Sequence, residues 1–170
     1  RAVRAVVGFP PGGGTDILGR IVATRMSESL KQQIIPDNRG GASGQIAAEL
    51  VAKAPPDGYT VMMAHIAALS ILPSLYTKLP YAGLEKDFEP VTVLAYVPNV
   101  IVVHPKHDFK NLSEFVAYAK ANPGKLNFGS AGNGTSHQLV GELFKSQAGV
   151  SLTHVPYRGA GPMKQDLLSG

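Results

Sequence analysis

The fold of this chain is decided by the stretch Val3-Arg-Ala-Val-Val-Gly-Phe-Pro-Pro-Gly-Gly-Gly-Thr-Asp16. Its first five residues form a short apolar run, which is typical of a buried parallel strand. The glycine-rich turn ends that strand, and Thr15 or Asp16 is suited to cap a following helix. We expect the helix to present an apolar face made by the side chains that recur at helical spacing, Ile17, Ile21, Val22 and Met26.

Strands and helices alternate along the rest of the chain. Further strands are expected at residues 33–35, 59–64, 126–128 and 152–157, and helices at 45–53, 111–122, 135–148 and from 163 onward. The stretch Asn111-Leu-Ser-Glu114 has the pattern of a capping box. Two more β-rich segments, 91–97 and 100–103, are separated by a Pro-Asn pair. This alternation predicts a parallel α/β fold.

Composition excludes several classes of protein. The chain has 170 residues, which allows one ordinary domain or two small lobes. Its 16 basic residues are scattered without a run or interleaved aromatics, which argues against a nucleic-acid partner despite a formal charge of +4. A modest positive field of this kind attracts small anions. The absence of cysteine excludes disulfides, thiol catalysis and zinc-thiolate sites.

An uncharged stretch at residues 58–77 is long enough to suggest a membrane span by hydropathy alone. It contains His65, Pro73 and two tyrosines. We interpret it as a buried strand, a turn and a short helix.

The chain contains a weak internal repeat. A strand and a glycine loop ending in Gly14-Thr15 precede a helix, a strand and Arg39-Gly-Gly-Ala42; the same order recurs with Gly134-Thr135 and Arg158-Gly-Ala160. Duplication is one explanation, and the general reuse of glycine turns by α/β folds is the other. Either way, the pattern predicts two similar lobes, each with a helix N-terminus at the carboxyl end of its first strand.

Such loops are suited to hold anions. The first turn of a helix leaves backbone N–H groups unpaired and carries about half a positive charge, so an anion placed there needs no cationic side chain. Thr15, Thr135 and Ser136 add hydroxyl groups. Two such loops facing each other would suit a small molecule with two anionic ends, or with one anionic and one polar end.

Other types of site fit less well. A P-loop requires a lysine that the stretch Gly14-Thr-Asp16 lacks, and a dinucleotide loop requires a small residue where Ile17 and His137 stand. No nucleophile elbow or metal-binding cluster is visible. An α/β enzyme, transferase-like and holding a phosphorylated substrate on the glycine loops, stays an alternative, with Asp16, His65 and His137 as its available acid–base groups. A module that binds partners through a flat surface is a third reading.

A set of motifs in order along the chain resembles one known family. Three long stretches are the most specific: Val6-Val-Gly-Phe-Pro-Pro-Gly-Gly-Gly-Thr-Asp16, Asp37-Asn-Arg-Gly-Gly-Ala-Ser-Gly44 and Ala54-Pro-Pro-Asp-Gly-Tyr-Thr60. Shorter matches are Leu79-Pro-Tyr81, Asp87-Phe-Glu-Pro90, Pro98-Asn99, Pro123-Gly-Lys-Leu126, Gly129-Ser-Ala-Gly-Asn-Gly-Thr135 and Val155-Pro-Tyr157. Together they resemble the periplasmic solute-binding proteins of tripartite tricarboxylate transporters, the Bug or TctC-like receptors.

This resemblance implies a two-lobed, periplasmic-binding-protein-like (Venus flytrap) fold with Rossmann-like α/β lobes. Residues 1–98 would form the first lobe and 99–170 part of the second. Because family members continue past the equivalent of Gly170, the resemblance implies a chain that is incomplete at its C-terminus. Whether this stretch closes on a ligand alone is left open.

The resemblance also implies a function without catalysis. A periplasmic monomer would capture a small organic carboxylate between its lobes (a dicarboxylate, an aromatic acid or an amino acid) and deliver it to the permease subunits of the transporter. No cofactor, metal or nucleic acid is expected, and the identity of the carboxylate is left open. The residues that would surround the ligand are Phe9, Gly13, Gly14, Thr15, Asp16, His65, Ala67, Ser130, Ala131, Gly132, Asn133, Gly134, Thr135 and Ser136.

Overall fold

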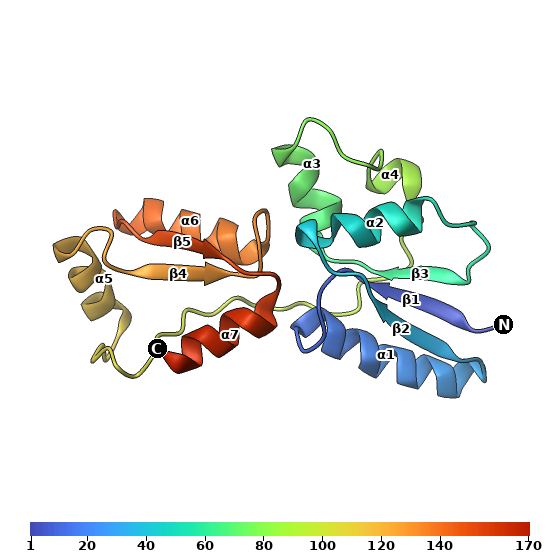
Figure 1. Ribbon diagram of the computed structural model, residues 1–170, viewed down its shortest axis with the longest axis horizontal. Helices are drawn as coiled ribbons and strands as arrows, with labels where there is room; N and C mark the ends of the chain where they lie inside the picture. The colour runs from blue at the N-terminus through green and yellow to red at the C-terminus, as the bar shows by residue number, and fades with distance from the viewer.

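The first strand, β1 (Val3–Val7), is the centre of a three-stranded parallel sheet in the computed structural model, which describes residues 1–170 (Figure 1). Its neighbours are β2 (Ile34–Asn38) and β3 (Thr60–Met63), in the order β2-β1-β3. The central position explains why β1 is an apolar run that is buried on both faces. Pro36 lies on β2, an edge strand, where the missing N–H does not interrupt a ladder on both sides.

Helices cover both faces of this first sheet. Helix α1 (Gly14–Leu30) packs on one face, over the core of Ala5, Val7, Ala23, Ile34 and Met63. The other face is covered by α2 (Gln45–Ala52) and by residues 67–88. That stretch contains a short π-helix (Ala67–Ile71), α3 (Leu72–Leu75) and α4 (Leu84–Asp87). The uncharged stretch at 58–77 is therefore a strand followed by short helices, as predicted, and no helix has the length and apolarity needed to cross a bilayer.

The predicted apolar face of α1 is wrong. Ile17, Ile21 and Met26 are 49%, 56% and 42% exposed, and only Val22 packs against the core. The buried side of the helix is instead made by Asp16, Gly19 and Ala23. A Cβ on Gly19 would lie only 3.4–3.5 Å from Met63 and Val7 side-chain atoms, so α1 approaches the sheet through its smallest residues. The buried face of α1 is therefore determined by how closely the helix can approach the sheet, and not by the hydrophobicity of its side chains.

The second lobe is built in the same way around a smaller sheet. Strands β4 (Asn127–Ser130) and β5 (Thr153–Pro156) run parallel, and α5 (Leu112–Ala121), α6 (Ser136–Ala148) and α7 (Ala160–Ser169) surround them (Figure 1). The capping box at the start of α5 is confirmed, because the Glu114 N–H donates to Asn111 Oδ1 at 3.0 Å. Helix α7 begins at Ala160, three residues before the predicted start. The core of the lobe is Ala119, Leu126, Val150 and Leu152.

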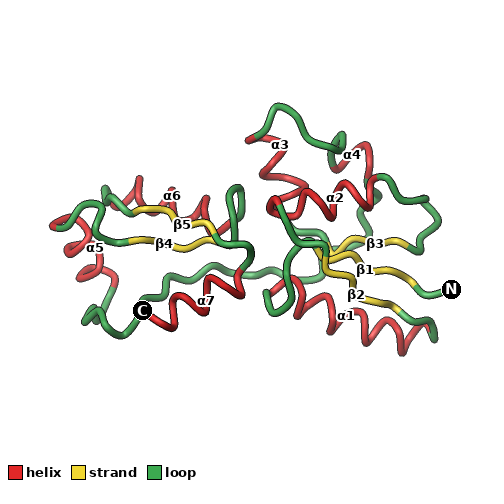
Figure 2. The backbone as a smooth tube through the Cα atoms, in the orientation of Figure 1, coloured by secondary structure: helices red, strands yellow, loops and turns green.

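The segment that joins the lobes corrects a second prediction. Residues 91–97 and 100–103 form no strand and run as an extended loop across both lobes (Figure 2). Their apolar side chains are exposed, with Val91 at 89% and Tyr96 at 90%. A strand requires a neighbour to complete its hydrogen-bond ladder, and neither sheet places one beside this segment. The boundary predicted at residue 98 falls in this segment and stays a prediction.

Candidate functional site

The first glycine loop connects β1 to α1. Phe9 is 7% exposed and anchors the loop, Gly12 adopts a positive φ of 85°, and Gly13 stands at the helix N-cap. No side chain caps the N-terminus of α1. Gly14 and Thr15 form the first turn and are partly or fully exposed. The predicted cap at Thr15 or Asp16 is wrong, because the helix begins at Gly14 and both residues lie inside its first turn. The loop therefore presents backbone N–H groups that no side chain caps.

Asp16 is the one carboxylate in the first turn of α1, and it is turned inward. It is 3% exposed and accepts hydrogen bonds from Gly12 N–H at 3.0 Å, Arg20 Nε at 3.0 Å and Asn38 Nδ2 at 2.8 Å. Burial acts to raise the pKa of Asp16, but the hydrogen bonds from Arg20, Gly12 and Asn38 together lower it. Its oxygens are thus used within the first lobe, where they fix the shape of the loop.

The second glycine loop, Ser130–Ser136, connects β4 to α6. The Ser130 hydroxyl and the Gly132 N–H form a hydrogen bond at 3.2 Å, and the Thr135 hydroxyl donates to the Gly132 carbonyl at 2.7 Å. Ser130 and Thr135 are both fully buried. The Thr135 hydroxyl hydrogen is therefore used inside the loop. As in the first lobe, no side chain caps the helix, although Thr135 occupies the N-cap.

Each glycine loop contacts the opposite lobe at the junction between the lobes. The Ser43 hydroxyl donates to the Asn133 carbonyl at 2.5 Å. Leu72 lies so close to Gly134 that a methyl group added there would overlap its Cδ2 atom, and a Cβ on Gly159 would lie 2.9 Å from Pro10 Cδ. The first loop thus touches the second lobe through Pro10, and the second loop touches the first lobe through Asn133 and Gly134, so both loops lie where the lobes meet.

His65 follows β3 at the carboxyl edge of the first sheet. Its ring meets the Phe9 ring edge to face, with centroids 4.8 Å apart, and its Nδ1 accepts the Ala67 N–H at 3.1 Å. Burial lowers the pKa of His65, and the charge that His137 can carry lowers it further. His65 thus lies beside the first loop. Ala67 is fully buried beneath it.

The predicted set of ligand residues omits four that the structure brings to the same junction. Ser43 and Leu72 contact the second lobe. His154 forms a 2.7 Å hydrogen bond with Ser130 and so holds the Ser130 side chain in place. His137 lies in the first turn of α6, with a buried Nδ1 that has no partner. In the sequence, Ser43 could have been found from its glycine-rich loop, and His137 from its place in the first turn of a helix. No sequence pattern points to Leu72 or His154 as residues of the site.

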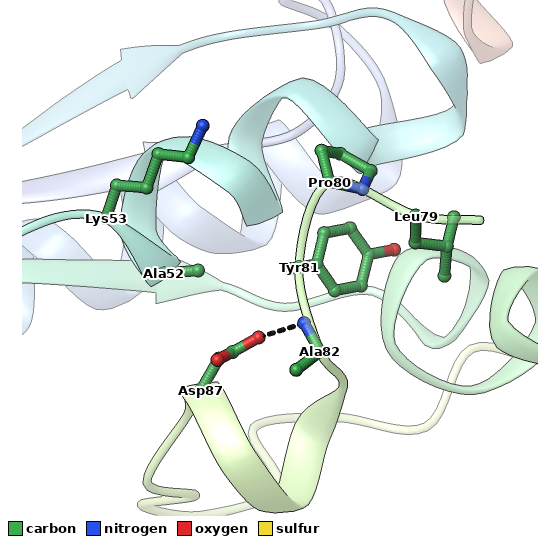
Figure 3. Close-up of a pocket in the computed structure, with 7 residues that line it drawn as sticks. All are labelled: Ala52, Lys53, Leu79, Pro80, Tyr81, Ala82 and Asp87. Carbon is green, nitrogen blue, oxygen red and sulfur yellow. Dashed lines mark hydrogen bonds between the residues drawn. The ribbon is translucent and has the colours of Figure 1, made fainter.

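One cavity lies away from this junction. Its volume is about 430 Å³, and it is an open hollow between α2 and residues 79–87 (Figure 3). Its polar groups already have partners, because Asp87 accepts from the Ala82 N–H and Lys53 pairs with Glu49. None of the predicted ligand residues lines it. We therefore place the candidate site at the junction of the glycine loops.

Comparison with protein families gives a direct match. Residues 18–170 match the family described as "Tripartite tricarboxylate transporter family receptor". A Pseudomonas sp. protein, "UPF0065 protein in tcbD-tcbE intergenic region", is 44% identical over all of this chain and 50% of its own length. "Protein BugT" of Bordetella pertussis is 38% identical over all of this chain and 52% of its own. The chain thus spans about half the length of the curated relatives it matches.

Solved structures show the same fold. One described as a periplasmic transporter gives a TM-score of 0.94 at 43% identity, over 98% of this chain and 55% of its own. An R. palustris protein with adipate gives 0.89 at 39% identity, and MatC from Rhodopseudomonas palustris with bound malate gives 0.88 at 36%. Each match covers 98% of this chain and 56% of the other. The predicted two-lobed α/β binding-protein fold is confirmed.

Proposed function

The chain belongs to the family of tripartite tricarboxylate transporter receptors that its motifs resemble, and from this we propose that it captures a small organic carboxylate between its two lobes. In this proposal the glycine loops that follow β1 and β4 hold the acid. The receptor acts as a monomer in the periplasm and passes the acid to the permease subunits of the transporter. It performs no chemistry on the ligand.

One observation carries the proposal: two helix N-termini without side-chain caps lie at the junction of the lobes. Each offers backbone N–H groups and the positive end of a helix dipole to an anion. Pro10 of the first loop packs at Gly159, and the Asn133 carbonyl of the second loop accepts from Ser43 of the first lobe, so both loops lie where the lobes meet. In this proposal one small molecule reaches both loops. An acid with an anionic group at each end satisfies both sites at once.

The charges around the loops favour recognition by backbone groups. Arg20 is held by Asp16 and Asn38, and Arg39 is held by Asp37, so these cations are already paired. Asp16 repels an anion less than its charge alone suggests, because Arg20 pairs with it. Carboxylates in solved structures of similar proteins, adipate and malate, agree with this class of ligand.

The enzyme alternative has one observation in its favour, the 2.7 Å hydrogen bond between Ser130 and His154. A catalytic serine must reach a substrate, and Ser130 is fully buried. The other ring nitrogen of His154 faces Gln138 at 3.5 Å and not a carboxylate. The pair therefore fits a role in shaping the second loop.

Isothermal titration calorimetry against a panel tests the proposal. The panel contains adipate, malate, an aromatic acid, an amino acid and ATP as a phosphorylated control. We expect saturable binding with one site per protein for at least one carboxylate and none for ATP. Clear affinity for ATP and for no acid would favour the enzyme alternative and overturn the proposal.

A further inference from the structure

The second glycine loop is held by two side chains that both contact His154. The Gly132 N–H donates to the Ser130 hydroxyl at 3.2 Å, and the Gly134 N–H donates to Gln138 Oε1 at 2.6 Å. Nε2 of His154 lies 2.7 Å from Ser130 Oγ, and its Nδ1 lies 3.5 Å from Gln138 Nε2. One imidazole ring on β5 therefore supports the loop at two points.

The orientation of Gln138 determines which nitrogen of His154 carries the ring hydrogen. Because Oε1 of Gln138 accepts the Gly134 N–H, the amide NH₂ group is the one that faces His154. Nδ1 of the ring then accepts, and the hydrogen on Nε2 is donated to Ser130 Oγ. Ser130 in turn donates to the Gly132 carbonyl at 3.2 Å. Every donor in this set meets an acceptor when the ring is neutral.

A second proton on His154 is incompatible with this arrangement. The proton would be on Nδ1, where it would face the NH₂ group of Gln138. If the Gln138 amide rotated to offer its oxygen to the ring, its nitrogen would face the Gly134 N–H. In both cases two donors oppose each other and a hydrogen bond is lost. The support of Gly134 thus requires a neutral His154.

The first glycine loop is held in a similar way, but without a histidine. The Gly12 N–H donates to Asp16, four residues later, as Gly134 does to Gln138. Asn38, at the end of the neighbouring strand β2, donates to Asp16 at 2.8 Å. Asn38 does not titrate, and the pKa of Asp16 is held below its ordinary value of 3.8. Of these two supports, only that of the second loop contains a group that titrates between about pH 5 and pH 8.

Resting on the function proposed above, we propose that His154 is a positioning residue of the carboxylate site, whose neutral ring holds the second glycine loop in its binding form. It acts through Ser130 and Gln138 and not by contact with the acid. Protonation of His154 removes the support of Gly134 and weakens carboxylate binding. The receptor thus binds its acid more tightly near neutral pH than in a mildly acidic medium.

The surroundings of His154 favour the neutral ring near pH 7. Phe128, its partner on β4, stacks on the ring with centroids 4.8 Å apart. Burial lowers the pKa of His154 from its ordinary value of 6.5, while on α6 Glu142 raises it and Lys145 lowers it. Asp166 belongs to α7, which covers the other face of this sheet (Figure 1). The ring is partly exposed, so a proton from solvent can reach it as the pH falls.

Calorimetry with adipate between about pH 7.5 and pH 5 tests this in native protein and His154→Gln. The glutamine can still donate to Ser130 but does not titrate in this range. At neutral pH we expect the variant to bind about threefold to tenfold more weakly, because Gln138 loses its acceptor. The native protein should lose this advantage as the pH falls below 6.5. Protonation of adipate itself affects both proteins equally and cancels in the ratio of their affinities.

A control variant and a measurement without variants complete the test. His107→Gln, at a ring that stacks on Phe109, should keep the native pH profile. In the NMR spectrum of native protein, the Gly134 amide should titrate with the same midpoint as the His154 ring, and the Gly12 amide should not. A pH-independent affinity ratio, or a Gly134 amide that does not follow His154, would overturn this inference alone. If native protein binds no carboxylate at any pH, the proposed function fails and the inference falls with it.

Discussion

Leu72 of the first lobe packs directly against the backbone of Gly134 in the second, and a side chain added at Gly134 would force Leu72 to move. Gly134 also adopts a positive φ of 74°, which only glycine accepts without strain. The contact lies just before α6, whose N-terminus is part of the candidate site. The close contact between the two lobes at this point thus depends on the absence of a side chain at Gly134.

Replacement of Gly134 by alanine should open the junction. The added methyl group overlaps Leu72, so we expect ligand affinity to fall at least about tenfold, which corresponds to about 1.4 kcal/mol. The matched control is Gly124→Ala, at a φ of 72° with no atom within 4 Å. Both variants should lose about 1 kcal/mol of unfolding free energy from the backbone conformation. Calorimetry and urea unfolding measure the two effects, and equal affinities for the two variants would contradict the role of the contact.

Asp16→Asn should destabilise the first lobe. The substitution removes the charge that pairs with Arg20 and turns one acceptor into a donor facing Asn38, so we expect a loss of about 1–3 kcal/mol in unfolding free energy. Because the pKa of Asp16 is lowered in the folded state from its ordinary value of 3.8, the native contribution is present above that value and is lost as the pH falls below it. The gap between native protein and variant should therefore narrow between pH 5 and pH 2. Urea unfolding across that range checks this, and a constant gap would argue against an ionised Asp16.

The hydrogen bond from the Thr135 hydroxyl to the Gly132 carbonyl should stabilise the second lobe. Thr135→Val removes the donor and keeps the shape, so we expect a loss of about 1 kcal/mol in unfolding free energy. Thr135→Ser keeps the hydroxyl and should keep most of the stability. If Thr135→Ser is more destabilising than Thr135→Val, the methyl packing and not the hydrogen bond is the important contribution.

Asn111→Ala should weaken the second lobe without touching the site. Asn111 accepts from the Glu114 N–H at 3.0 Å, and removal of such a cap costs about 1 kcal/mol. Ser113→Ala, on the same exposed turn, serves as the control and should be nearly neutral. Hydrogen exchange of the α5 amides measures the effect, which should be faster exchange in Asn111→Ala only. Ligand affinity should be unchanged in both variants, and a loss of affinity in Asn111→Ala would tie this cap to the site.

The sequence predicted those parts of the fold that local rules control. The strand–glycine loop–helix units and the α5 cap follow from turn chemistry and capping, so their positions are right within a few residues. The buried face of α1 does not follow from hydrophobicity, because the helix approaches the sheet through Gly19 and Ala23. Residues 91–103 have strand propensity but no partner strand. Propensity cannot report whether a neighbour is present.

The candidate site, too, could be predicted only where local sequence patterns determine it. Glycine loops are visible in the sequence, so the residues around Thr15 and Thr135 could be named. The direction of a side chain is decided by tertiary contacts: Asp16 turns inward to Arg20, and the Thr135 hydroxyl turns to Gly132. The contacts between lobes, such as Ser43 with Asn133, join residues 90 positions apart, and no local pattern predicts them.

Amide chemical shifts give the most direct test that both glycine loops hold one ligand. In a titration of ¹⁵N-labelled protein with adipate, the account predicts that amides at residues 12–15 and 132–136 shift together with one shared dissociation constant. Shifts confined to one lobe, or centred on Lys53 and Asp87 at the outer cavity, would contradict it.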